Sequence, residues 1–286
     1  MEGLFMPFAE LSDVRCYYEL AGSGEPVIFI PGLGATSQAW LPVAEHLSDE
    51  FTTICIDNRE IGQSVSKRPP HTVSDYSADL AELFDHLQIE QAHIVGISMG
   101  GVIAQRFAVD HPSSVGRLVL ISSSYQFGPY LREIAQLVGQ IMHRFPKHIF
   151  ARTMEVLGAG PLHLDANPRR IDDKIRQLLE VNVSTKATMR QLRALGASRF
   201  LPNEYRIAAK TLVVAGEFDS LIPHCYARQM ARLIDDSHFV LIRNAGHNPI
   251  MESPHTLMPL IREFLCSGRV INFPDHEYEL SRQNVA

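Results

Sequence analysis

A serine stands between two glycines in the segment Gly96-Ile97-Ser98-Met99-Gly100. The apolar run 93–97 leads into it and predicts a buried strand, and the amphipathic run that follows, to about Ala108, predicts a helix. A sharp strand–turn–helix connection lifts a serine hydroxyl above the edge of a sheet, and small residues on both sides prevent collisions in the turn. An incidental serine in a glycine-containing turn is the alternative, but this context favours a nucleophile.

A nucleophilic serine needs a base, and thirteen histidines compete for that role. His247 follows the last expected strand, 238–242, so it lies at the carboxyl edge where ligands of open α/β sheets bind. Three of the other histidines occupy different places. His93 begins a strand, His111 ends a helix, and His224 belongs to the first turn of one. We therefore expect His247 to be the base.

The base in turn needs a carboxylate that orients it. Asp219 lies in the turn after the expected strand 211–216, on the same edge as His247. Asp235 and Asp236 end a helix on the opposite side of the sheet. The chain order Ser98, Asp219, His247 is that of one known class of catalytic triad, although Asp219 could instead cap a turn.

A tetrahedral oxyanion needs two hydrogen-bond donors. We expect the backbone N–H groups of Met99 and Leu33, the latter in the loop after the apolar run 27–30. The segment 32–37 also resembles part of a dinucleotide fingerprint, with Asp57 ending the next strand. Its sixth position is Ser37 rather than glycine or alanine, so the hydrolytic interpretation is favoured.

The elements that position these residues alternate between strand and helix. Apolar runs predict strands, and helical spacing predicts helices between them, which together indicate an α/β fold with a mostly parallel sheet flanked by helices. The expected strands are 10–20, 27–30, 51–56, 93–97, 118–121, 211–216 and 238–242, and the expected helices are 36–47, 76–87, about 98–108, 223–233 and 254–265.

The alternation stops between residues 123 and 205, where helical stretches occur without a convincing strand. We expect an α/β core formed by 1–122 and 206–267, interrupted by a helical insertion over 123–205. Residues 268–286 are polar and are expected to form a loosely held C-terminal tail.

Composition excludes several classes of protein. The chain has 286 residues, 45% of them hydrophobic, and a net charge of −6, which is typical of a globular domain and unfavourable for general nucleic-acid binding. No apolar run approaches the ~18 residues of a membrane span. The N-terminus lacks a signal-peptide pattern and the cysteines form no CxxC, so we expect a cytoplasmic protein with reduced cysteines. The oligomeric state is not predicted.

Taken together, residues 12–266 resemble the α/β-hydrolase fold superfamily. The resemblance rests on the segments 31–34, 57–59, 96–101, 216–219 and 246–249. The insertion resembles the helical cap of capped members such as carboxylesterases, enol-lactonases and carbon–carbon bond hydrolases. The resemblance implies Ser98 as nucleophile, His247 as base and Asp219 as its orienting acid. A serine at position 98 disfavours the epoxide hydrolases and dehalogenases of the superfamily, which carry aspartate there.

Two residues depart from the pattern of the family. Pro31 stands where many relatives have histidine, which leaves the backbone donor of the next residues intact. Glu60 stands where relatives usually have glycine, which puts the shape of that loop in doubt. We expect Glu60 to be a solvated loop carboxylate.

These features predict a serine hydrolase that cleaves carboxylic esters, lactones included, without a cofactor or a metal ion. One alternative is an enol-lactonase or carbon–carbon hydrolase that acts on a carboxylate-bearing ring-cleavage product. The other is a ligand receptor with vestigial turnover. The expected partner is a small-molecule ester or lactone.

The charge of the insertion bears on the substrate. Residues 123–205 contain 12 Lys and Arg and 7 Asp and Glu, a net charge of +5, which leaves −11 on the rest of the chain. Most of these charges are expected to be solvated. A sharper hypothesis is that one or two of the arginines reach the cleft and bind a substrate carboxylate. Four apolar residues of the insertion would then line the pocket: Met142, Phe145, Met154 and Leu157.

Overall fold

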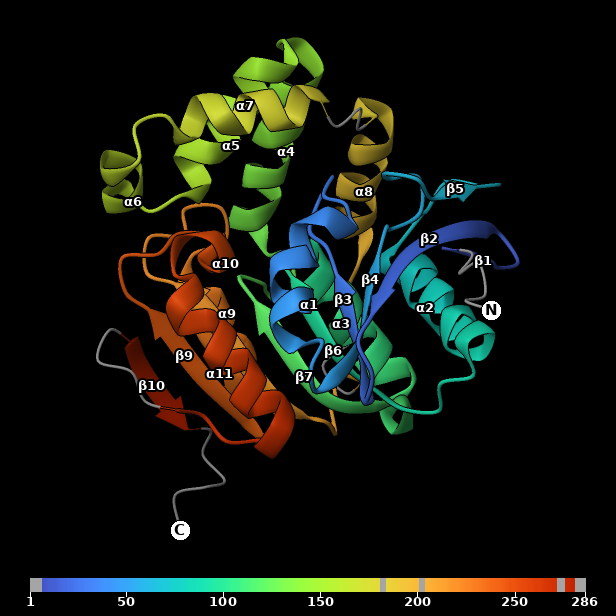
Figure 1. The fold of residues 1–286 in the computed structure, drawn as a ribbon. Helices are drawn as coiled ribbons and strands as arrows, with labels where there is room; N and C mark the ends of the chain where they lie inside the picture. Colours follow the sequence, from blue (N-terminus) through green and yellow to red (C-terminus); the bar gives the residue numbers. More distant parts are fainter. Residues whose placement is uncertain (1–6, 181–183, 201–203, 272–275, 281–286) are drawn as a thin grey trace.

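The computed structural model describes residues 7–180, 184–200, 204–271 and 276–280, and shows a ten-stranded sheet with helices on both faces (Figure 1). The strands are β1 (Phe8–Glu10), β2 (Val14–Ala21), β3 (Glu25–Ile30), β4 (Phe51–Ile56), β5 (Val65–Ser66), β6 (Ala92–Ile97), β7 (Val115–Ile121), β8 (Lys210–Gly216), β9 (Ser237–Ile242) and β10 (His276–Leu280).

The sheet is parallel at its centre and antiparallel at its edges. Its order is β1-β2-β4-β3-β6-β7-β8-β9-β10, with β5 paired to β2 outside this path. Neighbouring strands along the path β4-β3-β6-β7-β8-β9 pair in parallel, whereas β2 and β10 run antiparallel to their neighbours β4 and β9. The predicted fold class is therefore confirmed. The strand expected at 10–20 corresponds to β2, which forms an antiparallel hairpin with β1.

Helices cover both faces of the sheet and its upper edge. The helices are α1 (Leu41–Leu47), α2 (Val73–Leu87), α3 (Met99–Asp110), α4 (Pro129–Arg144), α5 (Lys147–Gly158), α6 (Pro161–Ala166), α7 (Arg170–Glu180), α8 (Thr185–Ala197), α9 (His224–Leu233), α10 (Pro249–Glu252) and α11 (Pro254–Ser267), with 3-10 turns at Ser37–Trp40 and Pro112–Ser114. Buried side chains of α2, α3 and α9 form one hydrophobic core with the sheet, and those of α1 and α11 form the second. Burial on both faces explains why the central strands read as continuous apolar runs.

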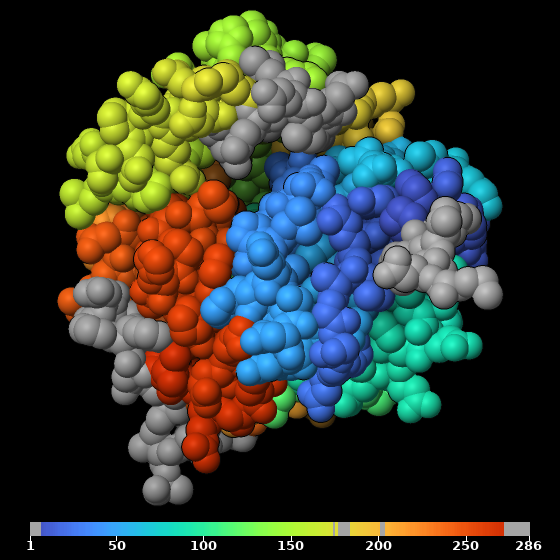
Figure 2. Space-filling view, in the orientation of Figure 1, coloured from blue at the N-terminus to red at the C-terminus, as the bar shows by residue number. Residues whose placement is uncertain are grey.

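In the part of the chain that the structure describes, five helices, α4 to α8, lie between β7 and β8, and we refer to these helices as the cap. Figure 1 shows them together above the end of the sheet at which β6 leads into α3. The yellow-green segments of the cap rest on the orange-red segment that contains α10 (Figure 2). Residues 181–183 and 201–203 of the expected insertion lie outside the described residues. No helix in the described part of the chain is both long and apolar enough to cross a membrane.

The C-terminal segment differs from the expectation. Residues 268–286 were expected to form a loosely held tail, but His276–Leu280 form β10, which pairs with β9 along its whole length. The expectation was wrong there because polar side chains give no hydrophobic signal, whereas an edge strand is held by its backbone hydrogen bonds. Residues 272–275 and 281–286 of that tail lie outside the described residues.

Candidate active site

Ser98 occupies the turn between β6 and α3. Its backbone has φ 54° and ψ −119°, a conformation that costs free energy for any residue other than glycine. Its N–H donates to the carbonyl of Ile121 on the neighbouring strand β7, at 2.8 Å. A Cβ on Gly96 would lie 2.4 Å from the Gly100 carbonyl oxygen, and one on Gly100 would lie 2.1 Å from that of Ile30. The turn can therefore form only when positions 96 and 100 are both glycine.

Asp219 lies in the turn after β8 and is 4% exposed. Its Oδ1 accepts the backbone N–H groups of Leu221 and Ile222, at 3.0 and 2.9 Å. These two bonds fix the carboxylate so that its second oxygen, Oδ2, lies 2.7 Å from Nδ1 of His247. The carboxylate can therefore hold the imidazole in one orientation and one tautomer.

His247 lies in the loop between β9 and α10. A Cβ on Gly216 would lie 2.0 Å from the carbonyl oxygen of Gly246, so the turn that carries Asp219 and the loop that carries His247 approach as closely as glycine allows. The N–H of His247 donates to the carbonyl of Gly158, the last residue of α5. The cap thus contributes to the placement of the histidine.

The electrostatic surroundings of His247 favour its charged form. Burial alone lowers the pKa of His247, but the charge and hydrogen bond of Asp219, together with the charge of Glu252, keep that pKa above its ordinary value of 6.5. A histidine stabilised in this way is suited to accept a proton during a reaction.

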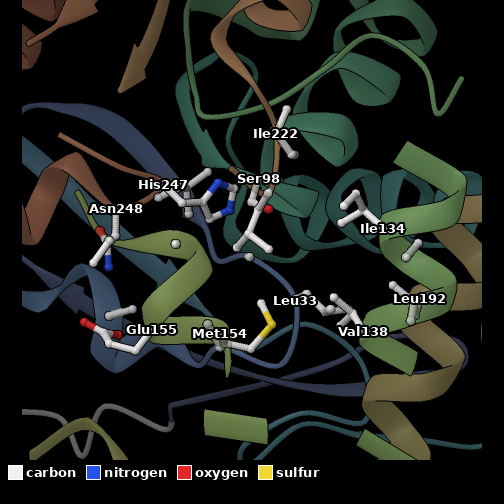
Figure 3. A pocket seen from close by; sticks show the side chains of 18 of the residues that line it. Leu33, Ser98, Ile134, Val138, Met154, Glu155, Leu192, Ile222, His247 and Asn248 are labelled. Atoms are coloured by element: carbon white, nitrogen blue, oxygen red, sulfur yellow. The ribbon is translucent and has the colours of Figure 1, made fainter. Parts of the chain in front are cut away.

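Ser98 and His247 meet at the wall of one cavity. Both residues line it, and Figure 3 shows the His247 ring next to the Ser98 side chain. The structure therefore brings together the three side chains predicted from the sequence, one from each of three loops at the carboxyl edge of the sheet.

Of the two expected oxyanion donors, Leu33 lines this cavity, and Met99 follows Ser98 directly in the chain. A Cβ on Gly32 would lie 3.4 Å from Cβ of Ser98, which brings the loop of Leu33 against the serine. Met99 is the first residue of α3, where backbone N–H groups are not used by the helix. Within the described residues, the N–H groups of Leu33 and Met99 have no hydrogen-bond partner.

The segment that resembled a dinucleotide fingerprint has another structural role. Asp57 is 2% exposed, and its carboxylate accepts the N–H groups of Ser37 and Gln63, at 2.7 and 2.8 Å. These bonds use the buried carboxylate to join two loops, and Asp57 is not among the residues that line the cavity at Ser98. The competing side chains lie elsewhere. His93, near the start of β6, has its Nε2 3.1 Å from a carboxylate oxygen of Glu25. Asp235 and Asp236 precede β9 at the opposite edge of the sheet.

Glu60 is not the solvated carboxylate that was expected. Its φ is 64°, which explains why glycine suits this position. Its carboxylate forms two hydrogen bonds of 2.6 Å with the guanidinium of Arg190 on α8, and its side chain is 15% exposed. The next residue of that helix, Gln191, accepts the N–H of Gly34 at 2.8 Å through its Oε1. Sequence reasoning missed both contacts because they join segments about 130 and 157 residues apart.

The cavity has a volume of about 290 Å³ and lies between the carboxyl edge of the sheet and the cap. Of the four apolar residues expected there, only Met154 lines it. Met142 borders a separate small pocket, and Phe145 is exposed. Arg170 reaches the cavity, as the hypothesis about the cap arginines required, but its Nε donates to Glu155 at 2.5 Å. In the part of the chain that the structure describes, no group of three or more His, Cys, Asp or Glu side chains could hold a metal ion.

Comparison with known proteins identifies a family that this chain matches over most of its length. A profile of the family described as alpha/beta hydrolase fold matches residues 25–254. A thermophilic esterase from Thermogutta terrifontis is similar in structure, with 28% identity, a TM-score of 0.78, and coverage of 88% of this chain and 93% of that one.

Two further similarities are weaker in sequence. The enol-lactonase of Burkholderia xenovorans LB400 has 22% identity and a TM-score of 0.81, with coverage of 91% of this chain and all of the other. The "Putative carbamate hydrolase RutD" of Azorhizobium caulinodans has 23% identity over 85% of this chain and 91% of its own length. At this level of identity, the likeness to the enol-lactonase shows the fold alone.

Proposed function

The chain belongs to the alpha/beta hydrolase family, and from that premise we propose that it is a serine hydrolase that cleaves small carboxylic esters, lactones included, through an acyl-enzyme. In this proposal Ser98 is the nucleophile, His247 the general base and Asp219 the residue that orients the base. The backbone N–H groups of Leu33 and Met99 form the oxyanion hole.

The first half of the reaction forms the acyl-enzyme. His247 removes the proton of the Ser98 hydroxyl through Nε2 while the hydroxyl oxygen attacks the carbonyl carbon of the ester. The carbonyl oxygen becomes an anion and accepts hydrogen bonds from the Leu33 and Met99 N–H groups. When the bond to the leaving oxygen breaks, the imidazolium passes its proton to that oxygen, and the alcohol departs.

The second half regenerates the enzyme. Water enters the position of the alcohol, His247 takes one of its protons, and the resulting hydroxide attacks the acyl carbon. The second tetrahedral intermediate expels Ser98, which regains its proton from His247, and the carboxylic acid leaves. A lactone follows the same steps, with its own hydroxyl as the leaving group.

One observation carries the proposal: His247, whose Nδ1 lies 2.7 Å from Oδ2 of Asp219, lines the same cavity as Ser98. Ser98 reaches this cavity from a turn with a strained backbone. Asp219 and Glu252 keep the pKa of His247 above its ordinary value, which suits a general base. The esterase of Thermogutta terrifontis, at 28% identity, supports the choice of esters.

A hydrolase of carboxylate-bearing ring-cleavage products remains the second candidate because Arg170 lines the cavity. We rank it lower because Arg170 is bound to Glu155, so a substrate carboxylate would have to displace an internal partner.

The test is a hydrolysis panel of neutral esters, lactones and ring-cleavage dienones, each assayed with wild-type protein and Ser98→Ala. We expect turnover of esters or lactones that the Ser98→Ala variant loses. Turnover of dienones alone would support the second candidate. A single burst of product followed by negligible turnover would favour a ligand receptor.

A further inference from the structure

The cavity at Ser98 has two chemically different ends (Figure 3). The apolar end is formed by cap residues of α4 and α8: Leu131, Ile134, Val138, Leu192 and Leu195. The polar end is formed by residues of the cap and of the loop after His247: Glu155, Arg170, Asn248 and Glu252. In Figure 3, Ser98 and His247 lie between Ile134, Val138 and Leu192 on one side and Glu155 and Asn248 on the other.

The charged groups of the polar end form one neighbourhood. Glu252 accepts the backbone N–H groups of Gly246 and Asn248, at 2.8 and 3.3 Å, which places it beside His247. Arg170, Glu252 and Glu155 all act electrostatically on the nearby His163, whose pKa is lowered first by burial and then by the charge of Arg170.

The carboxylate of Glu252 is bound by backbone N–H groups of the protein itself. Besides those two bonds, its Oε2 accepts the N–H of Gly160 at 2.8 Å. Three backbone donors thus satisfy this carboxylate, which joins the cap to the loop of the histidine. The groups left for a substrate are Glu155, Arg170 and the side-chain amide of Asn248.

These remaining groups balance in charge and offer both donors and acceptors. Glu155 is 8% exposed and binds Nε of Arg170 through Oε1. That bond uses one of the five N–H groups of the guanidinium and one of the two oxygens of the carboxylate. An anionic group placed here would meet Glu155, and a cationic group would meet Arg170. A neutral group such as a hydroxyl can donate to the carboxylate and accept from the guanidinium or the amide.

The reaction determines which part of the substrate lies at each end. In the proposed mechanism His247 passes its proton to the leaving oxygen, so the leaving group lies on the histidine side of Ser98. The polar end lies on that side, since Asn248 follows His247 directly and Glu252 binds the residues on either side of it. The acyl group is therefore directed to the apolar end.

We propose that the substrate is an ester of an apolar acyl group with a small neutral alcohol that carries at least one further hydroxyl. This inference rests on the proposed function and adds the substrate class. The cavity volume of about 290 Å³ restricts both parts to a few carbon atoms.

The test compares three esters of similar size on the wild-type protein. They are propyl pentanoate, 3-hydroxypropyl pentanoate and propyl 5-hydroxypentanoate. The first two give the same pentanoyl-enzyme, so their kcat/KM values differ only in the acylation steps. After correction for their rates of alkaline hydrolysis, we expect 3-hydroxypropyl pentanoate to be preferred over propyl pentanoate by about tenfold, the effect of one hydrogen bond to a charged group. Propyl 5-hydroxypentanoate should be the poorest of the three.

A pair of double variants assigns the preference to the polar end. Glu155→Leu with Arg170→Met removes the ion pair while retaining much of its volume, and should abolish the preference for the hydroxylated alcohol. Arg152→Met with Asp172→Leu is the matched control, because that pair joins the same two helices at 3.2 Å but is exposed. The control should keep the preference of the wild type.

Equal kcat/KM for the two pentanoates, or a preference that survives Glu155→Leu with Arg170→Met, would overturn the inference and leave the proposed function standing. If that double variant does not fold, the three wild-type values decide on their own. Failure to hydrolyse any of the esters would overturn the proposed function and this inference with it.

Discussion

Ser98 shows how much chemistry depends on a single backbone conformation. A φ of 54° is unfavourable for serine by about 1–3 kcal/mol, and the turn exists because the flanking glycines and the strands beside them leave no alternative. The sequence predicts this residue well because glycine, serine and the switch from strand to helix periodicity are all local signals. Glu60 has a similar φ of 64°, but no local signal reveals what stabilises it there, since its partner Arg190 lies on the cap.

The pKa of His247 leads to a prediction about pH. The general base must be neutral, so kcat/KM should fall as the pH decreases through this raised pKa, on a limb above the ordinary histidine value of about 6.5. In Asp219→Asn the main cause of the raised value is removed while burial remains. The limb should therefore move to lower pH, and the plateau should fall by about 10³–10⁴-fold.

The measurement is a pH profile of ester hydrolysis for both proteins, with Asp235→Asn as the control that keeps the wild-type profile. An acidic limb that stays in place in Asp219→Asn, or a loss of activity in Asp235→Asn instead, would contradict the assignment of the acid.

Among the elements, α8 is the one that links the cap to the loops of the site. Arg190 and Gln191 bind two different loops of the core, and Thr188 packs on Gly34, with its Cγ2 3.1 Å from where a Cβ would lie. Sequence periodicity predicts a helix in this region but gives no information on the loops it contacts. The loops that follow parallel strands share one edge of the sheet, which is why the sequence could place Asp219 and His247 on the same edge.

The contact of Gln191 with Gly34 predicts a positioning role. Gln191 is 1% exposed, and its bond fixes the residue next to the expected oxyanion donor Leu33. Gln191→Met removes the acceptor and should lower kcat about tenfold with little change in KM, a fraction of the 10²–10³-fold loss of a whole oxyanion donor. A trifluoromethyl ketone inhibitor should weaken by the same factor.

Conservative replacement separates this role from simple packing. Among the described residues, Nε2 of Gln191 is buried without a hydrogen-bond partner, so Gln191→Glu keeps the acceptor for Gly34, loses no bond and should retain most of the wild-type kcat. Arg193→Met, on the exposed part of the same helix, is the control. A rise in KM at constant kcat in Gln191→Met would rule out a role in the oxyanion hole.

The pair of Glu60 and Arg190 predicts a contribution to stability. Arg190→Met should lower the free energy of unfolding by about 1–3 kcal/mol, because a mostly buried carboxylate then loses two hydrogen bonds. Arg176→Met should have little effect, since Arg176 and its partner Asp173 are exposed. Urea denaturation of Arg190→Met, Glu60→Gln and the double variant would measure the coupling, and independent, additive effects would show that the pair does not act as one unit.

At the scale of the whole molecule, several arginines of the cap form ion pairs, most of them with acidic side chains of the cap that its net charge already counts. Arg190 binds an acid of the core, while Arg152, Arg170 and Arg176 bind acids of the cap itself. Composition gave the net charge of +5 over 123–205 but could not give these pairings, which depend on how the helices pack. For the same reason the sequence predicted the parallel core of the sheet but not the pairing of β10 with β9.

The pairing of charges in the cap predicts no gain in kcat/KM for anionic substrates. The arginine at the cavity is balanced by Glu155, so an ester with a remote carboxylate should have a kcat/KM no higher than that of its neutral counterpart. The ratio of the two values should not fall as salt increases, because Arg170, the arginine that lines the cavity, is paired with Glu155. A preference for the anionic ester that weakens with salt would instead support binding of a carboxylate by the cap arginines.

The central claim, an acyl-enzyme on Ser98, is tested most directly by acid-quenching the protein during turnover of 4-nitrophenyl butanoate and mapping the modified peptide by mass spectrometry. We predict one butanoyl group per chain, on the peptide that contains Ser98, and none in Ser98→Ala, whose kcat should fall by several orders of magnitude. A butanoyl group on another residue, or a Ser98→Ala variant that keeps about a tenth of the wild-type kcat, would contradict the account.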